Sequence, residues 1–455
     1  MLVGVSEIAS ACAIGSKGLR RSRGLRCSKG SSVTVPVDSI TRRRFVWLAA
    51  LAGGSLALSG CAADGADGSG AESSSGTMFD EPGQTGGEGA GDGQNPEDAA
   101  AAARAAVDER IGAMTLEQKV AQLFIVTPEA LVEGVSQVTQ AGEATHEGVT
   151  AHPVGGIVYF AQNLLDPEQT TTMLANVKQF YADAGNVAPF IAVDEEGGTV
   201  VRIADNEAFS VQDVGDASAL GSAGDTEAAK RAAEQIADYL APLGFNLDFA
   251  PVADVVNPLR SDTMGLRSFS SDASVAADMV RAEVEGFRDK KMLCCAKHFP
   301  GVGAAPGDSH EGAITIDSTN EELETVDLVP FRAAIEAGVP MIMVGHVSLP
   351  NIVGDSTPAP LSSAVVQGML RDSLGYTGII VTDSLSMGAI TDYYTPAEAA
   401  VAALKAGCDI PLMPERFDEA YQGVLNAVQA GELTEERIDE SLIRILTAKQ
   451  EYFGL

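Results

Sequence analysis

The segment from Cys294 to Gly312 gathers the side chains of this sequence that are best suited to chemistry. An apolar run ends at Lys297-His298, and a loop rich in glycine and proline follows, with Asp308 and His310. A histidine beside a carboxylate can hold or move a proton near neutral pH. Catalytic groups often lie on a loop that leaves a buried strand. A core strand with a solvated turn explains the same composition, so the rest of the chain must decide.

Short runs of β-forming residues recur along the chain after Thr115. We predict eight strands, at Gln122–Thr127, Gly156–Phe160, Phe190–Asp194, Leu247–Val252, Leu293–His298, Met341–His346, Ile379–Asp383 and Cys408–Met413. Amphipathic helical stretches separate them, among them Ala228–Ala241, Ala273–Lys290 and Ala397–Ala406. Apolar strands with helical crossovers predict a parallel sheet covered on both faces. Eight such units over about 350 residues fit an α/β fold of the (β/α)8 TIM barrel type, and a doubly wound open sheet is the alternative.

Polar residues cluster where these predicted strands end. The residues are Asp194, Glu195, Glu196, Asp254, Lys297, His298, His346, Asp383 and Ser384. In a barrel the carboxyl ends of all strands meet on one face, where the active sites of this fold lie. An isolated buried charge is costly, so this many charges at strand ends indicate a functional site.

Five segments, in order, resemble the motifs of the β-N-acetylhexosaminidases of glycoside hydrolase family 3. They are Val193–Gly198 with Arg202, Gly265–Phe269, Lys297–Gly301, Asp308-Ser309-His310 and Val381–Met387. The resemblance runs from about Met114 to Leu455. It implies a retaining glycosidase, in which one group attacks the anomeric carbon and a second protonates the leaving oxygen.

The resemblance also implies roles for single residues. Asp383 would be the nucleophile, and His310, oriented by Asp308, would be the acid and base. Sugar hydroxyls would be bound by Asp194, Arg267, Lys297 and His298, with Arg202 as a further binding residue that supports the Asp194 strand. We expect His346 behind the site, and we assign His146 and His152 to loops without a role.

The expected substrate is a terminal β-linked N-acetylglucosamine in cell-wall glycan or muropeptides, with no cofactor and no metal. Little chain follows Asp383, which favours the histidine type over the two-domain β-glucosidases of the family. A phosphorylase of the same family remains open. So do a metal-dependent hydrolase and a lipoprotein that binds sugar without catalysis, although the histidines lack a compact metal-binding spacing.

The amino-terminal region has the pattern of an export signal. Arginines at 42–44 precede the apolar segment Phe45–Ser59, which is shorter than the roughly 20 residues that span a membrane. Leu58-Ser59-Gly60-Cys61 resembles the lipobox of bacterial lipoproteins. We therefore expect residues 1–60 to be a signal peptide of the twin-arginine type, and Cys61 to be lipidated. This would anchor the protein to the outer face of the bacterial cytoplasmic membrane.

Composition narrows the remaining possibilities. Residues 61–100 are rich in glycine, serine and acidic residues and predict a disordered linker, followed by a single catalytic domain over 101–455. The net charge is −33, so we expect no nucleic-acid partner and a membrane contact only through the lipid. We also expect a monomer. The cysteines of the body, Cys294, Cys295 and Cys408, lie in apolar runs and are expected to be free and buried.

Overall fold

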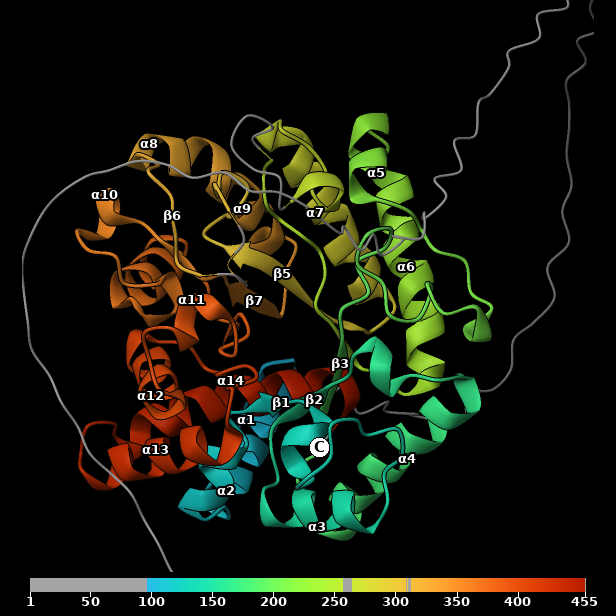
Figure 1. Ribbon diagram of the computed structural model, residues 1–455, viewed down its shortest axis with the longest axis vertical. Coiled ribbons are helices and arrows are strands. Elements are labelled where there is room, and N and C mark those ends of the chain that lie inside the picture. The colour runs from blue at the N-terminus through green and yellow to red at the C-terminus, as the bar shows by residue number, and fades with distance from the viewer. Residues whose placement is uncertain (1–95, 257–263, 308, 310–311, 455) are drawn as a thin grey trace, which may run out of the picture. The chain divides into compact units, whose positions relative to one another are not determined.

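The computed structural model describes residues 96–256, 264–307, 309 and 312–454 (Figure 1). The predicted signal peptide, the predicted lipidation site Cys61 and most of the predicted linker lie outside these residues. Asp308 and His310 lie outside them as well. The described residues belong to one compact unit, Gly89–Leu455. None of its described helices is long and apolar enough to cross a membrane.

A curled sheet of parallel strands lies at the centre of this unit, with helices around its outside (Figure 1). Its strand order is β1-β2-β3-β4-β5-β7-β9. The strands are β1 (Ile125–Val126), β2 (Gly156–Val158), β3 (Phe190–Val193), β4 (Leu247–Asp248), β5 (Leu293–Phe299), β7 (Met341–Val344) and β9 (Ile379–Thr382). Each coincides with one of the predicted strands. Their residues are buried without alternation, as expected for a sheet covered on both faces.

The eighth predicted strand, Cys408–Met413, is not a strand in the structure. Ile410 makes a single parallel bridge to Val381 of β9, and Leu412 makes one to Ile125 of β1. This segment therefore lies between the two outer strands of the sheet. Pro411 has no backbone N–H to donate, which explains why only isolated bridges form there.

Helices connect the strands and cover the sheet. The longer ones are α1 (Pro96–Gly112), α3 (Glu143–Ala151), α4 (Pro167–Asp183), α6 (Thr226–Leu243), α7 (Ala273–Asp289), α9 (Leu328–Glu336), α12 (Pro396–Ala406), α13 (Phe417–Gln429) and α14 (Glu435–Phe453). The shorter ones are α2 (Leu116–Ala121), α5 (Ala217–Ala223), α8 (Asn320–Glu322), α10 (Pro350–Val353) and α11 (Gly388–Thr391). Two π-helical segments, Leu323–Asp327 and Ala364–Ser373, and a separate pair of short parallel strands, β6 (Ile314–Thr315) and β8 (Val347–Ser348), complete the main elements.

The predicted helix α12 illustrates why these segments fold locally. Thr395 and Glu398 form a capping box, in which each side chain accepts a hydrogen bond from the other residue's backbone N–H. Pro396 occupies the first turn, where no donor is needed. Gly407 ends the helix at φ 114°, a conformation that favours glycine.

Asp409 connects the segment Cys408–Met413, which we call the closing segment of the sheet, to the helices outside the sheet. Its fully buried carboxylate accepts hydrogen bonds from Arg371 at 2.6 Å, Arg444 at 2.9 Å and Ser441 at 2.7 Å. The backbone N–H of Ile380 in β9 donates to it at 2.9 Å. A buried carboxylate is tolerated there because it is paired and fully hydrogen-bonded.

Lys449 of α14 is a fully buried lysine whose polar contacts are neutral oxygens. Its Nζ lies 2.8 Å from the carbonyl of Gly155 and 3.2 Å from Oε1 of Gln122. The ring centroid of Phe190 is 4.7 Å away. Burial lowers the pKa of Lys449 to about 7. The unfolded chain therefore holds this proton more tightly than the folded protein does.

This lysine predicts a pH-dependent stability. Below about pH 7 Lys449 is protonated in both the folded and the unfolded state. Above that pH the unfolded chain alone keeps the proton, so the free energy of unfolding of the wild type should rise relative to that of Lys449→Met. The rise should reach up to about 1.4 kcal/mol per pH unit and should end where the unfolded lysine also loses its proton. Urea unfolding of both proteins at pH 7, 8 and 9 measures this. Lys405→Met, at an exposed lysine of α12, is the control. Parallel stability curves for the wild type and Lys449→Met would contradict the prediction.

Candidate active site

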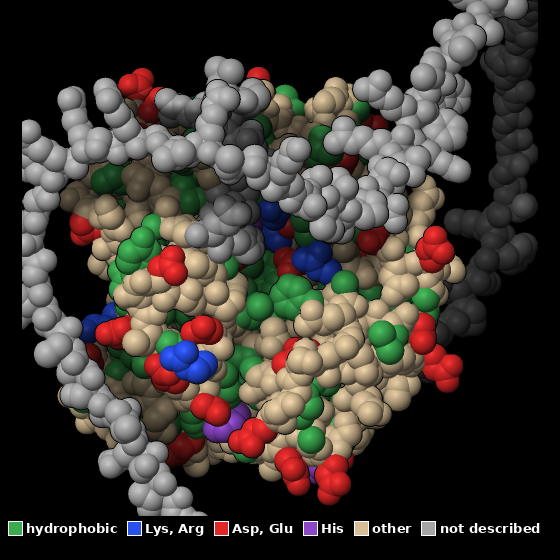
Figure 2. Space-filling model, in the orientation of Figure 1, with side chains coloured by type: hydrophobic (Ala, Val, Ile, Leu, Met, Phe, Trp, Pro, Cys, Tyr) green, Lys and Arg blue, Asp and Glu red, His purple; other side chains and the backbone are tan. Residues whose placement is uncertain are grey.

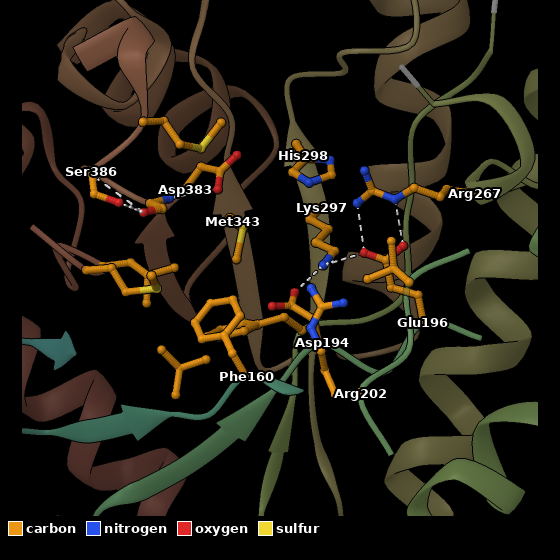
Figure 3. A pocket seen from close by; sticks show the side chains of 17 residues that line it. Phe160, Asp194, Glu196, Arg202, Arg267, Lys297, His298, Met343, Asp383 and Ser386 are labelled. Atoms are coloured by element: carbon orange, nitrogen blue, oxygen red, sulfur yellow. Dashed lines mark hydrogen bonds and ion pairs between the residues drawn. The ribbon is translucent and has the colours of Figure 1, made fainter. Parts of the chain in front are cut away.

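A cavity of about 420 Å³ opens where the strands end (Figure 3). All the predicted site residues that the structure describes line it, namely Asp194, Arg202, Arg267, Lys297, His298 and Asp383. Glu196, Phe160, Phe249, Met343, Ser386 and Met387 are among its other lining residues. In the space-filling view, basic side chains are visible in the hollow beside hydrophobic and acidic ones, and many further acidic side chains are spread over the outer surface (Figure 2). The chain thus brings these predicted residues together, while their roles remain predictions.

Lys297 is buried in one wall of the cavity. Its Nζ lies 2.7 Å from Oδ1 of Asp194 and 2.7 Å from Oε1 of Glu196. Burial alone would lower the pKa of Lys297, but these two carboxylates outweigh it and raise the pKa above its usual value. The lysine is therefore charged at neutral pH, and its ammonium is held by two fixed acceptors.

Arg267 reaches the same wall from the turn Gly265–Arg267. Its guanidinium makes two parallel hydrogen bonds to Glu196, from Nε to Oε2 and from Nη2 to Oε1, both 2.8 Å long. Although burial opposes the charge, Lys297 and Arg267 lower the pKa of Glu196 to about 2. The sequence interpretation gave Glu196 no role. The run of acidic residues after β3 could have indicated such a role for Glu196, because buried cations need carboxylate partners.

A local irregularity of β5 explains why two successive side chains, Lys297 and His298, both line the cavity. In a regular strand, neighbours point to opposite faces. Here the register of β5 against β7 shifts between Ala296 and Phe299. Such irregularities next to active sites re-aim a side chain.

Asp254 fixes the orientation of His298. Its Oδ2 lies 2.8 Å from Nδ1 of His298 and also accepts from that residue's backbone N–H at 3.2 Å. Its Oδ1 accepts from the backbone N–H of Val302 at 2.7 Å. Asp254 is fully buried, so its carboxylate binds His298 and has no contact with solvent. The sequence marked Asp254 as polar at a strand end but assigned it no partner.

Asp383 follows β9 on the opposite side of the cavity from Glu196 (Figure 3). Its backbone N–H donates to the carbonyl of Val344 at 2.8 Å, and its Oδ1 accepts from the backbone N–H of Ser384 at 2.7 Å. Burial would raise the pKa of Asp383, but His346, His298 and the Ser384 N–H bring it below the usual value. The carboxylate is thus ionised at neutral pH, as a nucleophile must be.

His346, which we expected behind the site, contacts the residue that follows Asp383. It is buried, and its Nε2 lies 2.7 Å from the carbonyl oxygen of Ser384. The predicted acid/base residues Asp308 and His310 lie outside the described residues. Ser309, between them in the sequence, lines a recess of about 40 Å³ to which Arg267, His298 and Asp383 also contribute.

The other two histidines differ partly from the prediction. His146 lies within helix α3, not in a loop, and its ring stacks on Phe180 with centroids 4.7 Å apart. The prediction of a loop for His146 was wrong, and Gly148 lies in the same helix. A Cβ there would meet the carbonyl oxygen of Leu131 at 2.0 Å, so the glycine serves close packing of the helix. His152 directly follows α3 and packs against aromatic rings of α13.

Arg202 lies beside Asp194 in the cavity wall, with its guanidinium carbon 5.7 Å from the ring centroid of Phe160. Its backbone is held by Glu195, which is fully buried. The Glu195 carboxylate accepts from the N–H groups of Arg202 at 2.5 Å, Ile203 at 2.9 Å and Ala204 at 2.9 Å. The hydroxyl of Tyr239 donates to it at 2.9 Å.

Glu195→Gln is expected to loosen this turn. A glutamine offers one oxygen to four donors and turns an N–H group toward the others, so we expect a loss of about 2 kcal/mol in unfolding free energy. Misplacement of Arg202 should also raise the KM for substrate several-fold. Urea unfolding and steady-state kinetics measure both effects, with the exposed Glu207→Gln as control. Unchanged stability would show that the carboxylate is dispensable.

The described residues contain no group of three or more His, Cys, Asp or Glu side chains that could hold a metal ion. Asp308 and His310, two of the ligands that a metal-dependent hydrolase would use, are not among these residues.

The fold and the site together define a class of protein. A curled parallel sheet carries an ionised carboxylate at one strand end, and across the cavity lie paired cations and carboxylates that suit sugar hydroxyls. Carboxylates at the mouth of such a fold are the groups that glycoside hydrolases use.

Comparisons with known proteins narrow the class. Residues 115–448 match the model of the glycosyl hydrolase family 3 N terminal domain. β-Hexosaminidase A of Pseudoalteromonas piscicida is 32% identical over 325 residues, which make up 67% of this chain and 54% of that protein. β-Hexosaminidase LpqI of Mycobacterium tuberculosis is 33% identical over 353 residues, 73% of this chain and 82% of that protein.

Comparison with solved structures leads to the same family. A glycoside hydrolase family 3 β-N-acetylglucosaminidase from Paenibacillus sp. str. FPU-7 superposes with a TM-score of 0.70 at 39% identity, over 75% of this chain and 63% of that chain. The chain belongs to glycosyl hydrolase family 3. The predicted family is thereby confirmed. The relatives named here are β-hexosaminidases and a β-N-acetylglucosaminidase. The chain spans about half the length of the Pseudoalteromonas relative.

Proposed function

We propose that this chain is a retaining exo-glycosidase that removes terminal β-linked N-acetylglucosamine from cell-wall glycan or muropeptides. The observation that carries the proposal is the ionised Asp383, which faces a wall of fixed sugar-binding groups across the cavity. The volume of about 420 Å³ falls in the range of small-molecule sites and suits one terminal sugar. The family and the names of the relatives support the same substrate class.

The proposed reaction has two steps. Asp383 attacks the anomeric carbon and forms an ester with it, while the bond to the leaving oxygen breaks and His310 gives that oxygen a proton. In the second step water attacks the same carbon, His310 takes the proton of the water, and the ester bond to Asp383 breaks. Asp308 orients His310 and stabilises its charged form. Ser309, in the recess beside Asp383, supports this placement.

The proposed sugar-binding residues are Asp194, Arg202, Arg267, Lys297 and His298. We further propose that the cavity is the mouth of a (β/α)8 barrel, in which the bridging segment Ile410–Leu412 takes the place of an eighth strand. The protein would be an exported monomer that is lipidated at Cys61 and held at the outer face of the membrane by the linker 61–100. Retention in the membrane fraction should then be lost in Cys61→Ala.

Release of the chromophore from a nitrophenyl N-acetyl-β-glucosaminide tests the proposal, with the corresponding β-glucoside as control. We expect turnover of the first and little of the second. Equal turnover of both would contradict the N-acetyl preference. A sugar phosphate formed only when phosphate is added would instead indicate a phosphorylase. Loss of activity with a chelator, restored by zinc, would indicate the metal-dependent hydrolase.

A further inference from the structure

Glu196 is the centre of the charged wall and is the residue of that wall to which the sequence gave no role (Figure 3). Its Oε1 lies 2.7 Å from Nζ of Lys297 and 2.8 Å from Nη2 of Arg267, so one oxygen joins two cations. Its Oε2 accepts from Nε of Arg267. These two cations come from separate elements, the end of β5 and the turn Gly265–Arg267, and this carboxylate connects them.

The neighbouring Asp194 differs from Glu196 in what it leaves open. Asp194 meets Lys297 through Oδ1, and its side chain is 19% exposed. The Glu196 side chain is 5% exposed, and both of its oxygens are already bound to cations. Asp194 can therefore accept a sugar hydroxyl, whereas Glu196 has little capacity left for substrate.

Without the charge of Glu196, the two cations would face each other across the gap. The positive charge of Arg267 lowers the pKa of Lys297, and the negative charges of Asp194 and Glu196 together outweigh this effect. Both cations lie within 2.8 Å of the same oxygen of Glu196. Two like charges that are so close in a wall with little water repel each other strongly. Lys297 would then lose its proton at a lower pH or turn toward Asp194 alone, and Arg267 would lose its bidentate anchor.

We propose that Glu196 is a positioning residue that holds Lys297 and Arg267 side by side in the geometry that binds the sugar. The inference rests on the proposed glycosidase function and adds a residue to it. Glu196 acts through the two cations and not on the reacting atoms. Its charge matters as well as its shape, because a neutral side chain of the same size cannot offset two positive charges.

The first test is Glu196→Gln. We expect kcat/KM for the N-acetyl-β-glucosaminide to fall about 100-fold, mostly through KM, because binding is lost equally in ground and transition states. We also expect KM to rise with pH below pH 10, where the wild type stays flat, since Lys297 loses a carboxylate that supports its charge. Glu196→Asp, which keeps the charge on a shorter stem, should recover part of the loss.

Glu283→Gln is the matched control. Glu283 of α7 is a buried glutamate whose pKa is raised to about 8 by burial and, to a smaller extent, by the negative charge of Glu196, so it is largely neutral at pH 7. Glutamine imitates that form, and we expect wild-type kinetics. Melting temperatures of all variants separate a loss of positioning from a loss of folding. An unchanged KM and a flat pH profile in Glu196→Gln would overturn the proposal.

A double-mutant cycle tests the bridging itself. In an Arg267→Met background only Lys297 remains, so no like charge needs to be offset. Glu196→Gln should then cost less than about 10-fold. A cost of 100-fold in both backgrounds would overturn the bridging role. If the wild type does not cleave the glucosaminide, the proposed function fails, and the affinity of the variants for free N-acetylglucosamine, measured by calorimetry, still decides the role of Glu196.

Discussion

Asp383→Asn should lower kcat for an N-acetyl-β-glucosaminide by roughly 10⁴-fold, which corresponds to about 5 kcal/mol of the barrier. The amide cannot form the glycosyl ester, yet it keeps the size of the carboxylate and can still accept the Ser384 N–H. KM should change little, because the residues proposed to hold the sugar lie mainly in the opposite wall. Single-turnover kinetics with a nitrophenyl substrate measure the chemical step directly.

The exposed Asp392→Asn, at the end of α11, is the control for this variant and should behave as the wild type. Asp383→Ala with added azide gives a second measurement. A retaining enzyme without its nucleophile should let azide attack from the vacated side and yield an α-glycosyl azide. A β-configured product, or more than a tenth of the wild-type rate in Asp383→Asn, would remove Asp383 from the role of nucleophile.

Lys297→Met should have the second-largest effect. The change removes the ammonium that Asp194 and Glu196 share, and with it the donor proposed to bind the sugar. We expect kcat/KM to fall roughly 10³-fold. Stability should fall by about 2 kcal/mol, below the 3–5 typical of a broken buried pair, because Glu196 keeps Arg267 and water reaches Asp194. Steady-state kinetics and urea unfolding measure the two quantities.

Lys119→Met separates the two effects. Lys119 of α2 is also buried and also meets two carboxylates, Glu435 at 2.8 Å and Asp439 at 2.7 Å, but it does not line the cavity. Its replacement should cost similar stability and leave kcat/KM unchanged at temperatures below unfolding. If both lysine variants lose activity in proportion to stability, Lys297 has a structural role alone.

The sequence predicted the positions of seven strands because buried parallel strands are near-continuous apolar runs, which local composition reveals. The closing segment around Ile410 was predicted as a strand for the same reason. Its apolar composition was correctly interpreted, but Pro411 limits its hydrogen bonding to single bridges. Helix α3 was missed because Gly148 and its polar neighbours weaken the helical pattern, and only packing against Leu131 makes the glycine an advantage.

The candidate site was predictable where a residue belongs to a motif and hidden where its role depends on a partner. Asp194 and Asp383 follow strands and Lys297 lies near the end of β5, so their convergence could be expected from the fold. Glu196 and Asp254 do their work through residues distant in sequence, Arg267 and His298. No local pattern states which acid pairs with which base, because that pairing is decided by three-dimensional proximity.

The free cysteines of the described part have a practical consequence for measuring how the sheet opens. Cys294 and Cys295 lie in β5 and Cys408 in the closing segment, all fully buried, and burial raises the pKa of each thiol. A thiol reagent can therefore reach them only through transient unfolding. In a variant whose other cysteines are serine, the labelling rate of Cys408 can be compared with that of the β5 pair. Faster labelling of Cys408 would show that the segment with the isolated bridges opens before β5, and equal rates would show that the two open together.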